Sequence, residues 1–268
     1  MIELTQITIY PVKSCKGMNL SKAMLSPFGL ENDRRWMVVG EDGTFLSQRT
    51  FPTLALVEPT LTPGFLQLQA PGTGSVEIPR ESNNKKPALV RIWDDSCTAT
   101  DCGDDAASML SDFLKVRCRL VSMSSEFSRA VSPKYSTKKD QVGFADAFPL
   151  LLISSASLRD LNDRLDLPVP MNRFRPNLVV SGCEPFAEDT WEHVAIGPLT
   201  FRVVKPCARC TVPSVDQSTG VSGKEPLTTL AMYRKLEGGK IYFGQNLVNE
   251  QKSGELIQGN EVIILQAS

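Results

Sequence analysis

The sequence predicts a β-rich α+β protein, and three observations support this fold class. Short segments in which apolar and polar residues alternate recur along most of the 268-residue chain, and such alternation is typical of half-buried strands. Pro-Gly, Asp-Gly and Gly-rich turns separate these segments, as expected for antiparallel strands. Helical spacing of apolar residues is found in residues 104–114, 156–165 and 226–236. The pattern favours an antiparallel barrel or sandwich with a few helices.

In the first half we expect mainly strands joined by tight turns. Asp42-Gly43 is a turn signal that should join two strands into a hairpin with Arg49 at its far end. Asp101 is predicted to cap the helix at 104–114, and 81–86 is predicted to be a polar loop. The strands are expected at residues 4–12, 36–39, 45–49, 55–62, 65–70, 75–78, 89–93, 97–101 and 116–122.

The second half begins with a polar, basic segment at residues 124–140. We expect a long exposed loop there, which is either a domain boundary or a lid over a site. Ser154 or Ser155 should cap the helix at 156–165. Strands are expected at residues 149–153, 178–181, 191–197, 199–204, 241–248 and 261–265.

Composition excludes several classes of function. The chain has 29 basic and 30 acidic residues, so we expect neither a nucleic-acid partner nor a membrane-surface partner. No apolar run reaches the roughly 18–20 residues that cross a bilayer, and the N-terminus lacks the pattern of a signal peptide. Seven cysteines without an export signal indicate reduced thiols and a cytoplasmic location.

The absence of certain residues and motifs from the sequence excludes further classes of metal site and enzyme. The chain has one histidine, His193, which excludes metal sites built from two or three histidines and which we expect to be structural or on the surface. Glycine-rich nucleotide-binding loops are missing from the sequence, which argues against a kinase or a nucleotide-dependent dehydrogenase.

The strongest candidate for a reactive centre is the segment 203–216, VVKPCARCTVPSVD. It contains the thiols of Cys207 and Cys210 together with Lys205 and Arg209. Nearby positive charge favours the thiolate, which is the form that attacks or binds metal. Pro206 and the later Pro213 predict a stiff turn after a strand. The alternative is a pair of structural thiols at a strand end.

Other cations lie at predicted strand ends. Lys13, Ser14 and Lys16 form a basic turn that suits an anion such as phosphate, although a solvated turn is the alternative. Arg34 or Arg35 either forms a surface ion pair with Asp33 or faces inward as an anion fork.

Arg173 and Arg175 alternate, so a strand-like backbone would point both to one face. Paired inward arginines are costly unless an anion meets them. The residue pattern alone therefore predicts that an anionic ligand binds near an activated thiolate, and it does not identify that ligand.

These segments carry a family resemblance. The chain resembles the MOSC family of molybdenum-cofactor proteins, most closely the bacterial YcbX-type proteins and the mitochondrial amidoxime reducing component. This implies an N-terminal β-barrel domain, which we assign to residues 1–122, and a MOSC-type β-barrel domain, assigned to 123–268. The motifs are YPVKSCKG (10–17), DRRW (33–36), DCGDDAASML (101–110), SSASLRDLN (154–162), NRFRPNLVVSGC (172–183), KPCARCTVPSVD (205–216), KEPLTTL (224–230) and FGQN (243–246).

The resemblance also implies a cofactor and an activity. It implies a molybdenum cofactor (molybdenum with molybdopterin), with Cys210 as the protein thiolate on the metal and Asp146 near the metal's water or the pterin. It implies reduction of N-hydroxylated compounds, namely amidoximes, hydroxylamines and N-hydroxylated bases, to amidines or amines. The residues expected to bind the cofactor are Lys13, Ser14, Arg34, Arg49, Arg173, Arg175, Asn177, Lys205 and Arg209.

Electron supply is where the sequence departs from relatives that carry a plant-type ferredoxin domain. The cysteines that hold a plant-type iron–sulfur cluster have the spacing C-x4-C-x2-C. Cys97 and Cys102 match the first part of this spacing, but the third cysteine, which should follow three positions after Cys102, is missing. We therefore expect no iron–sulfur cluster within this chain and a separate electron donor: a ferredoxin, a flavoprotein or a cytochrome b5-like protein. The basic residues at 129–139 are a candidate docking site for an acidic donor, or an ordinary solvated loop.

Two alternative functions remain open. One is sulfur transfer, in which Cys210 carries a persulfide. The other is a carrier that binds and hands on the molybdenum cofactor without turnover.

Overall fold

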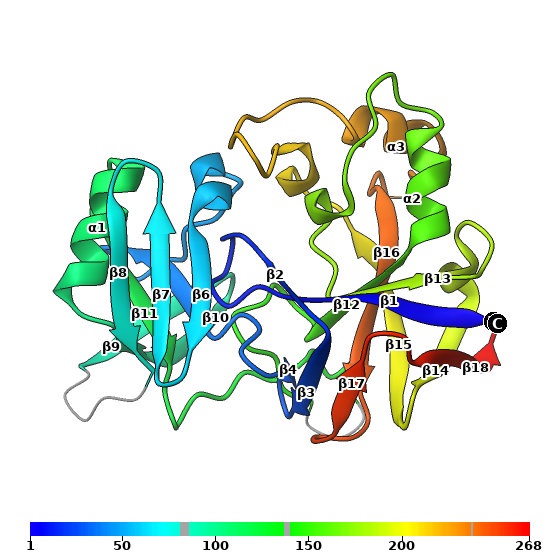
Figure 1. The fold of residues 1–268 in the computed structure, drawn as a ribbon, viewed down its shortest axis with the longest axis horizontal. Coiled ribbons are helices and arrows are strands. Elements are labelled where there is room, and N and C mark those ends of the chain that lie inside the picture. The colour runs from blue at the N-terminus through cyan, green and yellow to red at the C-terminus, as the bar shows by residue number, and fades with distance from the viewer. Residues whose placement is uncertain (81–85, 137–139, 237) are drawn as a thin grey trace.

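Seven strands close into a barrel in the computed structural model of this protein, which describes residues 1–80, 86–136, 140–236 and 238–268. The order is β13-β12-β16-β15-β14-β18-β1, and pairing of β1 with β13 closes the ring (Figure 1). A short strand, β2 (Met18–Leu20), pairs with β1 outside the ring. The barrel strands are β1 (Ile2–Ile9), β12 (Leu150–Ser154), β13 (Leu178–Ser181), β14 (Trp191–Ile196), β15 (Leu199–Ala208), β16 (Tyr242–Asn249) and β18 (Glu261–Ala267).

The barrel is filled by apolar side chains from every strand of the ring, among them Leu4, Leu152 and Phe201. β12 is buried on both faces, because Leu151 and Ile153 point outward into a second apolar cluster with residues of α2 (Ser155–Asn162) and α3 (Leu227–Tyr233). A strand that is covered on both faces needs apolar residues at every position. This explains why residues 150–153 are Leu-Leu-Leu-Ile instead of alternating apolar and polar residues.

The remaining strands form two antiparallel sheets beside the barrel and a small one next to it (Figure 1). Val38, Leu66, Leu110 and Leu120 belong to one core shared by both larger sheets and α1 (Asp104–Leu114). One sheet contains β5 (Trp36–Gly40), β11 (Cys118–Met123), β10 (Asp95–Asp101) and β9 (Pro87–Ile92). The other contains β6 (Glu58–Thr62), β7 (Phe65–Ala70) and β8 (Gly74–Pro79). The small sheet contains β17 (Glu255–Ile257), β3 (Lys22–Ser26) and β4 (Gly29–Leu30).

The two halves of the chain are interleaved. β1 pairs with β13 and β18, and β3 pairs with β17. Strands within residues 1–122 therefore lie in sheets completed by the second half. The turn at residues 10–17, directly after β1, therefore lies between the barrel and the neighbouring sheets.

The β-rich fold class is confirmed, but some local predictions are wrong. Asp101 does not cap α1: the N-cap is Gly103, and Asp101 Oδ1 accepts from the Gly103 amide. The expected hairpin forms only over its first residues: the turn closes with hydrogen bonds from the Gly40 amide to the Thr44 carbonyl and from the Leu46 amide to the Val38 carbonyl, and Phe45 bridges Val39, but 45–49 is not a full strand. Of the two predicted caps of α2, Ser154 is the N-cap and Ser155 is the first helical residue, and α2 and α3 are shorter than expected. Residues 81–85 of the predicted polar loop lie outside the described residues.

No helix in the described ranges combines the length and the apolar character needed to cross a membrane.

A glycine in β16 gives a test of barrel packing. Gly244 has a φ of +79°, and a Cβ there would lie 2.5 Å from Ile153 Cγ1 and 2.9 Å from the Leu152 carbonyl oxygen. We expect Gly244→Ala to lower the free energy of unfolding by about 3 kcal/mol, from backbone strain plus overpacking. Gly72→Ala is the matched control, since its φ is +77° and nothing lies within 4 Å; it should lose only about 1 kcal/mol. Equal losses in urea unfolding would contradict the packing argument.

Candidate functional site

A pocket lies where the turn after β1 meets the ends of β13 and β15 and the segment before β12. Nine of the eleven predicted site residues line it; Arg173 and Lys205 do not. The nine are Lys13, Ser14, Arg34, Arg49, Asp146, Arg175, Asn177, Arg209 and Cys210. Residues that are distant in the sequence and come from both halves of the chain therefore share one surface.

Tyr10 separates two arginines at the inner end of the pocket. Its ring centroid lies 4.4 Å from Arg34 Cζ and 4.1 Å from Arg175 Cζ. Arg34 donates to Asp33 Oδ2 at 2.6 Å, whereas Arg175 Nη2 is buried without a hydrogen-bond partner among the described residues. Burial, aided by the charge of Arg34, lowers the pKa of Arg175 to about 10. Such a donor usually has a partner; here it belongs to a cation that lines the pocket, as does the likewise unpartnered Nε of Arg209, which suits an anionic ligand.

The backbone around this inner end is strained. Ser14, Arg34 and Arg175 have φ values of 69°, 47° and 56°, a left-handed conformation that is uncommon outside glycine. Strain of this type persists where surrounding contacts hold it and clusters at ligand-binding sites. In this chain Gln48 is fully buried and donates to the Ser14 carbonyl at 2.7 Å.

An ion cluster forms the wall next to the thiols. The Asp146 carboxylate accepts from Lys13 Nζ and, at 2.6 Å, from Arg49 Nη2. Burial alone would raise the pKa of Asp146, but the charges of Lys13 and Arg49 outweigh it and hold that pKa well below its usual range. Burial also lowers the pKa of Lys13. Asp146 is therefore a carboxylate at neutral pH, and its side chain stays half-exposed to the pocket.

The two thiols of the C-x-x-C segment have different neighbours. Arg209 Nη1 donates to Cys207 Sγ at 3.1 Å, while its Nη2 donates to the Phe174 carbonyl at 2.7 Å. Arg49, which lies far away in the sequence, is close enough to Cys210 for the two side chains to interact electrostatically. The sequence left open whether Cys207 or Cys210 is the activated thiol. Of the two cations that flank them, Arg209 contacts Cys207, whereas Lys205 lies against the Tyr135 ring.

The predicted stiff turn at this segment is also corrected. β15 continues through Pro206 and Cys207 to Ala208. Proline lacks the amide that a ladder needs, so it is found at edges and bulges. Here Pro206 lies between two register shifts of the β15–β16 pairing, which accommodates it and ends the strand next to Cys210.

Arg173 and Lys205 point elsewhere. Residues 171–173 form a 3-10 turn, so the strand-like backbone expected for Arg173 and Arg175 is wrong. Arg173 donates to Asp216 Oδ2 at 3.2 Å and to the Pro213 carbonyl. Lys205 Nζ lies 5.1 Å from the Tyr135 ring centroid. Both side chains brace segments that carry pocket residues.

Asn177 lines the pocket but makes several structural hydrogen bonds. Its Oδ1 accepts from Arg34 Nη1 at 2.9 Å and from the Leu151 amide at 3.2 Å, and its Nδ2 donates to the Thr8 carbonyl. These bonds tie β1, β12 and Arg34 together at the inner end of the pocket.

Sequence reasoning missed Arg129. This arginine is buried and donates to the carbonyl oxygens of Gly143, Ala145 and Asp146, while its Nε donates to Asp95 Oδ2 at 2.6 Å. It therefore holds the backbone of the segment that presents Asp146. No local pattern signals this role, because the acceptors are main-chain atoms of a distant turn.

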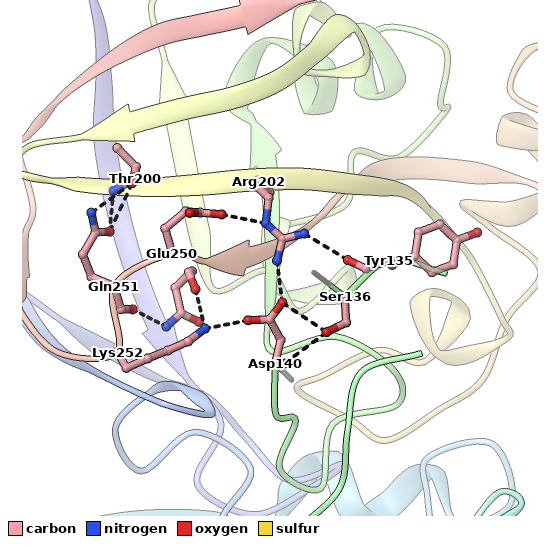
Figure 2. Close-up of polar contacts among 9 residues, drawn as sticks. Tyr135, Ser136, Asp140, Thr200, Arg202, Glu250, Gln251 and Lys252 are labelled. Atoms are coloured by element: carbon pink, nitrogen blue, oxygen red, sulfur yellow. Dashed lines mark hydrogen bonds and ion pairs between the residues drawn. The ribbon is translucent and has the colours of Figure 1, made fainter. Parts of the chain in front are cut away.

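The segment predicted as an exposed loop is exposed in part and anchored in part. Residues 125, 126, 128, 130 and 132–134 are exposed, whereas Arg129 and Asp140 are buried. Asp140 accepts from Arg202 and, at 2.7 Å, from Lys252 Nζ (Figure 2). Arg202 also donates to Glu250 Oε1 at 2.7 Å and to the Tyr135 carbonyl at 3.0 Å. These contacts connect the end of the segment to β15 and to the turn after β16. Residues 137–139 lie outside the described part of the chain.

A metal in this pocket would need ligands beyond the side chains. In the described ranges, no three His, Cys, Asp or Glu side chains come together as a metal site. One thiolate can hold a high-valent metal only if another molecule supplies further soft ligands. The same pocket is lined by this thiol and by Arg175, whose Nη2 lacks a partner among the described residues, which fits a metal carried by an anionic organic ligand.

The ion cluster makes a pH-dependent prediction. We expect Asp146→Asn to lower the free energy of unfolding by about 1–2 kcal/mol at pH 7, discounted because the carboxylate is half-exposed. A carboxylate with a lowered pKa stabilises the fold above its unfolded-state pKa of about 4, and this contribution is lost as the pH falls. The deficit of the variant, measured by urea unfolding, should therefore shrink below pH 4. If the variant's loss of unfolding free energy relative to wild type were constant from pH 7 to pH 3, the stabilising role of the Asp146 charge would be contradicted.

Comparison with known proteins agrees with this geometry. The MOSC N-terminal beta barrel domain matches residues 1–117, and the MOSC domain matches residues 139–263. Mitochondrial amidoxime-reducing component 1 of Mus musculus is 39% identical over 280 residues, covering 98% of this chain and 82% of that protein. The Homo sapiens protein of the same name is 36% identical over 283 residues, with the same coverage.

A third relative has a different name. Molybdenum cofactor sulfurase of Danio rerio is 34% identical over 267 residues, covering 92% of this chain but only 32% of that protein. Taken with the matches over nearly the whole chain, these similarities confirm the resemblance that the motifs indicated: this chain belongs to the MOSC family, as a relative of the mitochondrial amidoxime-reducing components.

Proposed function

We propose that this protein reduces N-hydroxylated compounds, such as amidoximes, hydroxylamines and N-hydroxylated bases, to amidines or amines with a molybdenum cofactor. The observation that carries the proposal is one pocket that joins Cys210 to the buried Arg175, whose Nη2 has no partner among the described residues. Support also comes from relatives named amidoxime-reducing components that cover almost the whole chain. We further propose that it acts in the cytoplasm.

The pocket contains the types of side chain that this cofactor needs: a thiol for the metal, and cationic and polar groups for the phosphate and pterin. We assign Cys210 to the metal, and Lys13, Ser14, Arg34, Arg175 and Asn177 to the phosphate and pterin, because they form the polar inner wall. Arg49 and Arg209 would hold the thiol end. When bound, the cofactor supplies the two-electron chemistry that removes oxygen from an N–OH group.

Asp146, which lines the pocket with Cys210, suits the substrate of this reaction. Conversion of N–OH to N–H and water consumes two electrons and two protons. Asp146 is ionised and can accept a hydrogen bond from the N–OH group, while the neighbouring Lys13 has a pKa lowered by burial. We assign Asp146 to orient the substrate through that hydrogen bond, with solvent as the source of the two protons; Lys13, assigned above to the cofactor, also donates to the Asp146 carboxylate and holds it in place.

Electrons would come from a separate donor protein, of the ferredoxin, flavoprotein or cytochrome b5-like kind. Of the basic residues considered for docking, Arg129 is buried and bound to main-chain carbonyls, so it is unsuited to this role. Lys134 is exposed and remains available to meet an acidic partner.

Sulfur transfer by Cys210 is the second candidate, and the similarity to a molybdenum cofactor sulfurase favours it. It requires a persulfide on Cys210, which mass spectrometry detects as one added sulfur. A third possibility, cofactor carriage, requires bound cofactor that exchanges readily and no reduction with any donor. Molybdenum analysis, pterin fluorescence and benzamidoxime reduction with a dye donor separate all three.

Substitution of the thiol tests the metal assignment. We expect Cys210→Ala to lower molybdenum content at least about tenfold and benzamidoxime reduction at least about a hundredfold, since the metal loses its protein ligand. Cys183→Ala is the control, because Cys183 is half-buried and outside the pocket. A Cys210→Ala protein with full molybdenum and full reduction would exclude the assignment.

The unpartnered arginine gives an independent test. We expect Arg175→Met to lower retained pterin fluorescence about tenfold through loss of a charge-assisted contact. The cofactor-free variant should be no less stable than wild type, because a buried charge without an anion is removed. Arg173→Met is the matched control, since it lies outside the pocket and pairs with Asp216. Equal retention by both variants would contradict the assignment.

A further inference from the structure

Three of the apolar residues that line the pocket, Ala147, Phe148 and Val212, are close in sequence to Asp146 or Cys210 and have no role in the cofactor assignment. Phe148 is half-buried there and Ala147 beside it is exposed, directly after the half-exposed Asp146. Val212, also half-buried, lines the pocket after Cys210. A phosphate and a polar pterin match the charged inner wall. These three apolar side chains are therefore suited to a different molecule.

The ring of Phe148 is held in position by a neighbouring aromatic residue. Tyr135 meets it edge to face, with centroids 5.5 Å apart and an interplanar angle of 74°. The Tyr135 ring in turn lies 5.1 Å from Lys205 Nζ. Edge-to-face pairs and cation–π contacts of this kind restrict ring orientation. Lys205, which does not line the pocket, therefore contacts the ring that packs against Phe148.

Buried ion pairs fix Tyr135 itself. Figure 2 shows its carbonyl accepting from Arg202, whose guanidinium also binds Asp140 and Glu250. Asp140 is only 2% exposed and also accepts from Lys252. Breaking a buried pair of this kind is strongly unfavourable. The support behind Phe148 is consequently rigid, and a preformed aromatic wall loses little entropy on binding.

We propose that Phe148 determines substrate specificity: its fixed ring packs against the organic group that carries the N–OH function, so aromatic N-hydroxylated substrates are preferred over small aliphatic ones. The proposal builds on the proposed reductase function. Tyr135, Asp140 and Arg202 are positioning residues in this scheme, since they act through Phe148.

The test compares two amidoximes that share the reacting group, benzamidoxime and acetamidoxime. With Phe148→Ala, the Kd of benzamidoxime measured by calorimetry should rise about tenfold, as expected for loss of a ring contact. The Kd of acetamidoxime should change less than about twofold. In turnover with a dye donor, KM for benzamidoxime should rise in parallel while kcat stays near the wild-type value, because the reacting group is unchanged.

Two variants make the result specific. Phe65→Ala is the control, because Phe65 is a partly exposed aromatic residue in β7 and outside the pocket. Tyr135→Ala should give a smaller rise in benzamidoxime Kd than Phe148→Ala, whereas Tyr135→Phe should restore wild-type binding. A merely structural role would affect both amidoximes alike.

The outcomes separate this inference from the reductase proposal. If the wild-type protein turns over neither amidoxime, the reductase proposal fails, and calorimetry still decides the role of Phe148. Equal changes in Kd for the two ligands, unchanged binding by Phe148→Ala, or no binding of benzamidoxime to wild type would each overturn the inference.

Discussion

Positive charge that is only partly neutralised by the protein is the constraint around which this site is built. Five cationic side chains line the pocket, Lys13, Arg34, Arg49, Arg175 and Arg209, together with one carboxylate, Asp146. Removing such charges from water is costly unless each finds hydrogen bonds and counter-charge. Main-chain carbonyls, the Tyr10 ring and Asp33 meet part of that need. The unpartnered donor of Arg175 marks where a bound anion would complete the balance.

The fold meets this constraint by drawing the pocket walls from both halves of the chain. Closure of the barrel through β1 and β13 aims the turn after β1 at the ends of β12 and β15. Two arginines then anchor the connection between the halves. The buried Arg129 holds the backbone that presents Asp146, and the half-buried Arg202 holds Asp140 and the Tyr135 carbonyl. A segment whose polar composition suggests an exposed loop is therefore fixed at Arg129 and Asp140, while other residues of it, such as Lys134, are exposed.

Local pattern failed where backbone geometry departs from regular repeats. Alternation suggested that Arg173 and Arg175 share a face, but Arg173 ends a 3-10 turn and Arg175 itself has a left-handed backbone. The prolines of the thiol segment suggested a turn, yet register shifts in its pairing with β16 carry β15 past Pro206. Arg49, which interacts with Cys210, is far from it in the sequence. In each case the deciding feature is a backbone conformation or a contact that alternation does not encode.

The sequence by itself determined the strand-rich fold class, most strand positions, the cap of α2 and, through its motifs, the MOSC family. These follow from apolar–polar alternation, turn residues and short motifs. Each of these signals involves only residues that are close together in the sequence, so it can be recognised without the structure. Only the tertiary structure decided which cations face the pocket, which brace its walls from behind, and which polar residues, such as Gln48, Arg129 and Asp140, are buried. Burial and ion pairing depend on contacts between residues that are distant in the sequence, such as Asp140 and Lys252, which are 112 positions apart, and even the 14 positions between Arg129 and Gly143 exceed the range of a local pattern.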